Sequence, residues 1–432
     1  MAEKSIKNKL HWVRLDNAAK IYPAARRKNW SNVFRQSVTL YEEVDKEVLK
    51  DALEICVKRF PSIAARLRKG AFWYYLQQVE NAPEIHEEYS YPLVFMSKEE
   101  MRKCAFRVIV YRKRIAVEFF HSLTDGTGAL IFLKNLVAEY LEKKHGINIP
   151  LEHGILDRKE APKDEELEDS FVKYAGNVCA TRKDTDAWHM SSEPQKDGFL
   201  HLTCFNFPVN QALDAAHKYN CTLTVFASAV MMMSLLNLQN EMNPIVKKQS
   251  RIKLLIPVNL RTLFPSNTLR NFAMYTIPEL DPRLGEYTFE EICKIIQHKM
   301  GTEFTAKHMS CVIATNVKDE KNTLLRLVPL PLKNAVMKAV FDTVGERKSC
   351  LSLSNMGKIK CPEIMEKYIS RFDFILGVQA AAPYNCGMLS YGDKVYVNFI
   401  RNTKNPELEK HFYNVLKQFG IDVKVESNRN ER

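Results

Sequence analysis

The stretch "VEFFHSLTDGTGALIFL", residues 117–133, places a histidine and an aspartate four positions apart between two apolar runs. His121 directly follows a strand-like run, and Asp125 precedes a glycine and a helical pattern. Both side chains are therefore expected on a tight connection between a strand and a helix. Asp125 is also a residue type that caps helix N-termini, which gives it a purely structural explanation.

His121 has two interpretations that this stretch leaves open. An imidazole beside a fixed carboxylate is the arrangement that a general base needs, because its reference pKa of about 6.5 lies near working pH. The other interpretation is a packed structural histidine. The H-x-x-x-D spacing is a weak signal alone, since His153 and Asp157 repeat it in a charged segment. Only the first copy leaves an apolar strand and is followed by glycine.

The surrounding patterns predict strands interleaved with helices. Residues 44–60 have the apolar spacing of an amphipathic helix that Pro61 ends. Two runs rich in Val, Ile and aromatic residues, 106–111 and 115–120, predict strands, and a helix follows from Gly126 to about residue 144. The second half of the chain repeats this alternation. We therefore expect an α/β fold, or a layered α+β fold.

The segment from about residue 151 to 199 differs in character, because it is dense in charge and poor in apolar residues. It predicts a surface crossover that contains a short helix at 171–181. We expect a first half at residues 1–180, a linker at 181–199 whose charged part begins near 151, and a second half at 200–432.

The composition excludes several classes of function. The formal net charge of +12 favours anionic partners, but no basic stripe interleaved with aromatic residues accompanies it, so we expect no nucleic-acid binding. The 10 cysteines include no C-x-x-C pair, which argues against a metal site and against a disulfide framework. They are expected to be reduced and packed.

Two stretches of the sequence bear on where the protein is located in the cell. The N-terminus "MAEKSIKNKLHWVRLD" lacks the apolar core of a signal peptide, so a cytoplasmic protein is the default expectation. The run "CTLTVFASAVMMMSLLNLQN", residues 221–240, contains Thr, Ser and Asn and predicts a buried helix and not a transmembrane segment.

Two further segments follow strand-like runs. "IPVNLRTLFPSNTLRNF" places Asn259 and Arg261 after one strand, and "LSLSNMGKI" places Ser354, Asn355 and Gly357 after another. With H-x-x-x-D-G at 121–126, P-V-N-L-R at 257–261 and S-N-M-G at 354–357 in this order, the chain resembles the CoA-dependent acyltransferase superfamily. That superfamily includes chloramphenicol acetyltransferase, the plant BAHD enzymes and condensation domains, and the pattern here is closest to bacterial alcohol acetyltransferase-like members.

Two departures limit the resemblance. Condensation domains usually carry two adjacent histidines, whereas residue 120 here is Phe, which resembles the CoA-using branches. The BAHD segment D-F-G-W-G corresponds here to "DFILG", with Asp373, Phe374 and Gly377 in place. This difference argues against membership of the plant family itself.

The resemblance implies a fold and a set of roles. The fold is two similar chloramphenicol-acetyltransferase-like halves that form a pseudo-dimer with a tunnel between them, which predicts a monomer. His121 is the implied general base, followed by Asp125 and Gly126. Asp125 is implied to turn away from the substrate and pair with Arg261, which fixes the loop. Ser354 and Asn355 are candidate oxyanion donors or simply close a turn before Gly357, and Asn259 is a further tunnel candidate.

The implied activity is O-acyl transfer, with an acyl group, most simply acetyl, moving from acyl-CoA to an alcohol hydroxyl by direct attack. Acyl-CoA is then a co-substrate, and neither a permanently bound cofactor nor a metal is expected. Ser122 lies beside His121, but no G-x-S-x-G elbow surrounds it, so we expect no acyl-enzyme. One alternative keeps the fold but takes the acyl group from an acidic acyl-carrier protein acting in trans. Another is a non-catalytic binding protein on the same fold.

Overall fold

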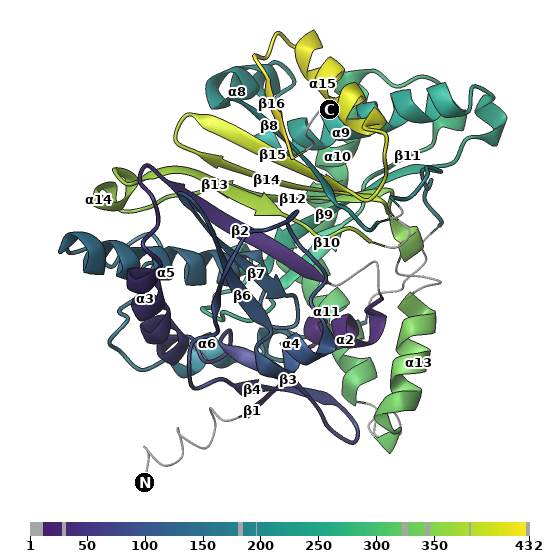
Figure 1. Ribbon diagram of the computed structural model, residues 1–432. Helices are drawn as coiled ribbons and strands as arrows, with labels where there is room; N and C mark the ends of the chain where they lie inside the picture. Colours follow the sequence, from purple (N-terminus) through teal and green to yellow (C-terminus); the bar gives the residue numbers. More distant parts are fainter. Residues whose placement is uncertain are drawn as a thin grey trace.

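A computed structural model describes residues 12–27, 32–179, 185–195, 197–321, 327–341, 346–379 and 382–428. The described chain is a mixed α/β structure with two lobes, each built on one large β-sheet (Figure 1). Layers of strands and helices are therefore present, as the alternating patterns predict.

The first lobe contains a five-stranded sheet with the order β13-β2-β7-β6-β5. Its strands are β2 (Val33–Leu40), β5 (Ile85–Glu87), β6 (Phe106–Tyr111), β7 (Arg114–Phe120) and β13 (Ile369–Ile375). Helices α3 (Lys46–Arg59) and α5 (Gly126–His145) pack on each other and cover this sheet (Figure 1). Phe119 on β7 meets Phe132 on α5 edge to face, with ring centroids 5.8 Å apart. The strands at 106–111 and 115–120 and the following helix therefore agree with the sequence prediction within a residue or two.

A smaller sheet with the order β1-β4-β3 lies beside this lobe. It consists of β1 (Trp12–Arg14), β3 (Ala65–Lys69) and β4 (Tyr74–Gln78). The short helices η1 (Ala18–Lys20), α2 (Ile21–Ala25) and α4 (Lys98–Lys103) belong to the same lobe. None of these elements has a strong periodic pattern in the sequence.

The second lobe contains an eight-stranded sheet with the order β10-β9-β12-β14-β15-β8-β16, and β11 pairs with β9. Its strands are β8 (His201–Pro208), β9 (Ile252–Asn259), β10 (Ala273–Thr276), β11 (Glu279–Leu280), β12 (Leu351–Lys358), β14 (Tyr384–Tyr391), β15 (Lys394–Arg401) and β16 (Lys424–Ser427). Helices α8 (Val209–Lys218), α9 (Leu223–Met242), α10 (Phe289–Glu303) and α15 (Glu407–Gln418) cover the face of this sheet that points away from the first lobe (Figure 1).

The remaining elements are short or peripheral. They are α6 (Asp164–Leu167), α7 (Ser170–Lys173), η2 (Val246–Lys248), η3 (Leu260–Thr262), η4 (Pro282–Leu284), α11 (Ala306–Lys321), α13 (Leu330–Val340), η6 (Glu346–Lys348) and α14 (Glu363–Glu366).

The two lobes join through strands that serve both cores. On β15, Val395 and Val397 pack in the core beneath the helices of the second lobe, whereas Tyr396 packs in the core of the first lobe. Alternation along a strand explains this division. The backbones of β13 and β14 approach closely, because a Cβ atom on Gly387 would lie 2.2 Å from the carbonyl oxygen of Phe374. Only glycine allows that approach.

Strand β13 pairs with β2 of the first sheet although it comes late in the chain. The segment from residue 200 onward therefore contributes to both sheets. The expected boundaries at residues 180 and 199 stay predictions.

The expected helix at 171–181 is wrong in length. Helix α7 covers only Ser170–Lys173, and residues 180–184 lie outside the described residues. The Gly176 amide donates to the carbonyl oxygen of Ser310 on α11, so the chain here follows another helix instead of forming its own.

Helix α9 contains the apolar run that we predicted to be a buried helix. Within the described part of the chain it is the one helix long and apolar enough to cross a bilayer, yet 72% of that stretch is buried inside the fold. That burial is the behaviour of a core helix. The ten cysteines are all free, and seven of them are buried, which confirms that most are packed thiols.

Candidate active site

His121 lies at the end of β7, between that strand and α5. Its backbone amide donates to the carbonyl oxygen of Asn32 at 2.8 Å. The imidazole stacks on Tyr22 of α2, with centroids 4.4 Å apart and ring planes 18° apart, and lies 5.0 Å from the ring of Phe34. The side chain is partly exposed. The ring is therefore held between two aromatic side chains but can be reached from outside.

The imidazole Nδ1 of His121 is 3.1 Å from the amide oxygen of Asn271. Packing against the two aromatic rings removes water from the imidazole, and this desolvation lowers its pKa below the ordinary value. The His121 main chain, Asp125, Asn271 and Asp16 partly oppose the shift. The ring is therefore neutral near pH 7, which is the form that can accept a proton.

The carboxylate of Asp125 is fully used in hydrogen bonds that do not involve His121. Its Oδ1 accepts from the backbone amides of Thr127 and Gly128, at 3.1 and 3.0 Å, and caps the start of α5. Its Oδ2 accepts from Arg261 Nη1 at 2.7 Å and from the Phe272 amide at 2.8 Å. Asp125 therefore anchors the loop and is not a relay to the imidazole.

Arg261 joins this anchor to the second lobe. Its guanidinium also donates to the carbonyl oxygens of Thr268 and Arg270, so all of its nitrogens are occupied. The side-chain oxygen of Asn259 accepts from the Arg261 amide at 3.1 Å and from Nη1 at 3.2 Å. Asn259 thus holds Arg261 in place, and this structure gives it no contact with His121.

The two glycines that follow Asp125 allow a close approach. A Cβ on Gly128 would lie 2.2 Å from both the Leu269 carbonyl oxygen and Thr124 Oγ1. A Cβ on Gly126 would lie 2.7 Å from the Met356 sulfur, which is the end of a flexible side chain. The backbone at Gly128 therefore has no room for a side chain, whereas Gly126 needs only a shift of Met356.

The remaining sequence candidates lie on β12 or next to His121. The expectation that Ser354, Asn355 and Gly357 follow a strand is wrong, because all three lie within β12. Asn355 donates to Thr224 Oγ1 at 2.9 Å and accepts from the Gly357 amide at 2.8 Å, where the pairing of β12 becomes irregular and φ of Gly357 is +73°. Ser354 lies on β12 opposite Gly387 of β14, just before the irregular part of that pairing. Ser122 is fully buried and donates to the Ala19 carbonyl oxygen at 3.0 Å, which turns its hydroxyl away from any substrate.

The segment that corresponds to the BAHD signature, residues 373–377, makes structural contacts where the two lobes join. Asp373 accepts from Arg371 Nη2 at 2.7 Å and from Asn398 Nδ2 at 3.2 Å. A Cβ on Gly377 would lie 2.6 Å from the Val33 carbonyl oxygen. These contacts hold β13 between the two lobes and supply no group to His121.

Sequence reasoning missed Asp16, Tyr22 and Asn271. Asp16 is completely buried and accepts from the side-chain amide of Asn271 at 3.1 Å. Asn271 stands in the segment that carries Arg261, so its place near a motif was the one available signal. Asp16 and Tyr22 lie in a stretch without clear periodicity, which gave no signal.

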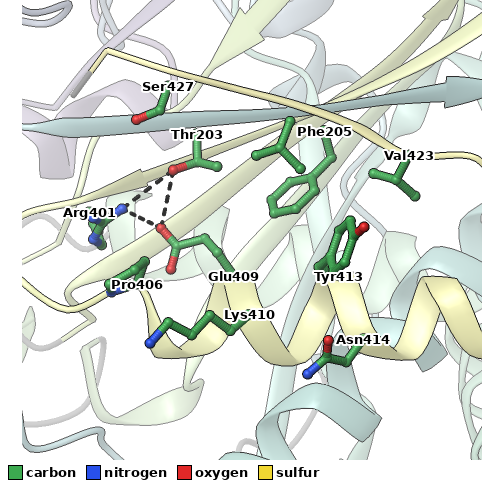
Figure 2. Close-up of a pocket in the computed structure, with 11 residues that line it drawn as sticks. Thr203, Phe205, Arg401, Pro406, Glu409, Lys410, Tyr413, Asn414, Val423 and Ser427 are labelled. Carbon is green, nitrogen blue, oxygen red and sulfur yellow. Dashed lines mark hydrogen bonds and ion pairs between the residues drawn. The ribbon is translucent and has the colours of Figure 1, made fainter. Parts of the chain in front are cut away.

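A separate cavity of about 710 Å³ lies between α15 and strands β8 and β16 (Figure 2). Arg401 and Glu409 form a buried ion pair at its edge, and Thr203 lies within 3.5 Å of Glu409. Burial raises the pKa of Glu409, and Arg401 opposes that shift. None of the residues singled out above lines this cavity. Within the described residues, no cluster of His, Cys, Asp and Glu could hold a metal ion.

No protein-family model matches the sequence, and no curated protein matches it. Solved structures do match. The trichothecene 15-O-acetyltransferase TRI3 from Fusarium sporotrichioides is 10% identical, with a TM-score of 0.59 and 94% of each chain covered. TRI101 of F. graminearum, solved with coenzyme A and T-2 mycotoxin, is 12% identical, with a TM-score of 0.61 and 95% of this chain and 99% of that chain covered.

The first condensation domain of the CDA synthetase is 12% identical, with a TM-score of 0.58 and 94% of this chain and 96% of that chain covered. At these identities the likeness shows the fold, and it spans nearly the whole chain. The fold implied by the resemblance of the motifs is therefore confirmed. The tunnel between the halves stays a prediction.

Proposed function

We propose that this protein, which has the two-lobed fold of the CoA-dependent acyltransferases and condensation domains, is an O-acyltransferase. It transfers an acyl group, most simply acetyl, from acyl-CoA to an alcohol hydroxyl. The observation that carries the proposal is the state of His121. Its ring is partly exposed and bound through Nδ1 to Asn271, desolvation lowers its pKa, and no described residue forms a hydrogen bond with Nε2.

In the proposed reaction, His121 Nε2 takes the proton of the acceptor hydroxyl as the oxygen attacks the thioester carbonyl. The carbon–oxygen bond forms, the carbon–sulfur bond breaks, and His121 returns the proton to the departing thiolate. Proton transfer of this kind is worth about 10²–10⁴-fold in rate, so positioning of the two substrates and stabilisation of the oxyanion supply the rest. Ser354 is the remaining side-chain candidate for an oxyanion donor, since the Asn355 amide is occupied.

Three observations support this assignment over the alternatives. Asp125 and Arg261 fix the loop of His121, an anchoring that a histidine without a chemical role does not require. The Ser122 hydroxyl is buried and engaged, which favours direct transfer over an acyl-enzyme. A solved structure with the same fold holds coenzyme A.

A carrier-bound donor is the second candidate. The likeness to a condensation domain favours it, and the net charge of +12 suits an acidic carrier protein as well as the phosphates of CoA. The chemistry at His121 is then unchanged, and only the group that bears the thioester differs.

We also propose that the active unit is a monomer. His121 and Asp16 come from the first lobe, and Arg261 and Asn271 come from the segment that follows β9 of the second sheet. A single chain therefore supplies both sides of the site.

The test is thiol release from acetyl-CoA in the presence of a panel of short and medium alcohols. We expect alcohol-dependent release by the wild type and a loss of at least 10²-fold in His121→Ala at unchanged melting temperature. His298→Ala, an exposed histidine on α10, is the matched control and should retain full activity. Release that survives in His121→Ala would refute the role of His121. Activity only with a carrier-bound thioester would select the second candidate.

A further inference from the structure

A neutral imidazole carries its proton on either Nδ1 or Nε2, and only the first form leaves Nε2 able to accept a proton. We propose that Asp16 and Asn271 are positioning residues that hold the His121 proton on Nδ1. The functional consequence rests on the acyl-transfer proposal, whereas the proton position itself does not.

The chain of contacts begins at Asp16, which is completely buried. Its Oδ1 accepts from the Ala19 amide at 2.7 Å. Its Oδ2 accepts from the Asn271 backbone amide at 3.3 Å and from Asn271 Nδ2 at 3.1 Å, and Arg270 Nε lies 3.7 Å away. Burial raises the pKa of Asp16, whereas Arg270 and the hydrogen bonds from Ala19 and Asn271 oppose that shift. Every group that faces the two oxygens is a donor, so both oxygens of Asp16 act as acceptors.

Because Asp16 accepts, Asn271 must present its NH₂ group to Asp16 and its carbonyl oxygen to the other side. That oxygen is the atom 3.1 Å from His121 Nδ1. An amide oxygen cannot donate, so Nδ1 must carry the hydrogen. The orientation of the Asn271 amide therefore acts together with the hydrogen bond between the ring and the main chain of His121 to select the tautomer of the imidazole.

The same contacts link proton position to the docking of the two lobes. Asp16 and His121 belong to the first lobe, and Asn271 lies between β9 and β10 of the second sheet. The stacked ring of Tyr22, whose carbonyl oxygen accepts from Asn32 Nδ2 at 2.9 Å, keeps the imidazole in the plane that this hydrogen bond needs. His121 is therefore a competent base only when both lobes are in place.

The first measurement is the ¹⁵N NMR spectrum of the histidine rings of the ¹⁵N-labelled wild type at pH 8, with His121 assigned by its loss in His121→Gln. We expect a neutral ring protonated on Nδ1. A wild-type ring protonated on Nε2 would overturn the inference and leave acyl transfer open. A ring protonated on Nδ1 in a protein without thiol release would support the inference and contradict the proposed function.

Two variants then test the source of the effect. Asp16→Asn lets the Asn271 amide turn over, and Asn271→Ala removes the acceptor, so both should move part of the His121 population to the Nε2-protonated form. We expect kcat to fall about tenfold with KM nearly unchanged. Asn267→Ala, an exposed amide bound to Glu165, is the control. Circular dichroism establishes whether the variants are folded. If they are folded and their tautomer equals that of the wild type, the inference is wrong. If they do not fold, the wild-type spectrum still tests the position of the proton, and a ring protonated on Nε2 overturns the inference.

Discussion

Arg261 and Asp125 lie 136 positions apart in the chain and form a 2.7 Å ion pair in which both side chains are mostly buried. The pair ties the loop that carries His121 to the second lobe. Asp125 also caps α5 and accepts from the Phe272 amide, so one carboxylate connects the strand end, the helix start and the opposite lobe. The position of the histidine therefore depends on a contact that contains no reacting atom.

The first prediction concerns this ion pair. Asp125→Asn should destabilise the fold by about 3 kcal/mol, because removing one partner leaves the mostly buried Arg261 guanidinium uncompensated. Activity should fall in the same variant, since the loop of His121 loses its anchor. Urea unfolding and thiol release measure the two effects.

The matched control is Asp51→Asn, an exposed aspartate on α3. It should unfold at the same urea concentration as the wild type. Unchanged melting and unchanged turnover in Asp125→Asn would show that the ion pair does not hold the loop.

The second prediction compares Gly126 and Gly128, the two glycines at the start of α5. Gly128→Ala should lower the free energy of unfolding more than Gly126→Ala. At position 128 the new Cβ meets the Leu269 carbonyl oxygen at 2.2 Å, whereas at position 126 it meets the flexible side chain of Met356. Overpacking typically lowers stability by roughly 1–3 kcal/mol. The clash with backbone in Gly128→Ala should lie at or above the upper end of that range.

The control for this pair is Gly301→Ala on α10, where a Cβ has open space. Gly to Ala inside a helix should gain up to about 1 kcal/mol. Thermal unfolding of the three variants gives the order. Equal destabilisation at positions 126 and 128 would contradict the close approach of the Gly128 backbone to the Leu269 carbonyl oxygen.

The third prediction separates direct transfer from a serine acyl-enzyme. Ser122→Ala removes one buried hydrogen bond to Ala19, which should cost about 1 kcal/mol of stability and leave kcat within a few-fold of the wild type. A nucleophilic serine would instead lose nearly all activity on this change. Mass spectrometry of the wild type mixed with acetyl-CoA alone should show no acetylated protein.

The sequence predicts the parts of this site that are local in the chain. The strand end, the helix start and the residues His121, Asp125 and Gly126 follow from one stretch, because alternation, a cap residue and glycine are signals within a few positions. The pairing of Asp125 with Arg261 was available only through the resemblance of the motifs, since spacing does not place residue 261 beside residue 125.

The groups that determine the state of His121 were not predictable in this way. Tyr22, Asp16 and Asn271 reach it through long-range packing, and their own segments have no apolar periodicity that marks them. The exchange of β13 into the first sheet escaped prediction for the same reason, because strand patterns reveal that a segment is a strand and not which strand it pairs with. Asn259 and Asn355 show the reverse case, since both were site candidates but form hydrogen bonds with Arg261, Gly357 and Thr224 and not with His121.

The last prediction uses the pKa of His121. Desolvation between Tyr22 and Phe34 lowers that pKa from its ordinary value of 6.5. The base must be neutral, so kcat/KM should be constant above pH 7 and should fall as the pH drops through the lowered pKa, with its midpoint below 6.5. A ring without this packing would have its midpoint near 6.5.

The variant Tyr22→Leu tests the physical cause. Without the stacked ring, water reaches the imidazole, and the attraction of Asp125 and Asp16 for the charged form meets less opposition. The midpoint of kcat/KM should therefore move upward, toward or beyond 6.5, while Tyr75→Leu, whose ring lies beside Trp12 on the small sheet, should leave it unchanged. A midpoint above 6.5 in the wild type, or one that stays in place when Tyr22 is replaced, would mean that packing against Tyr22 does not set the proton affinity of His121.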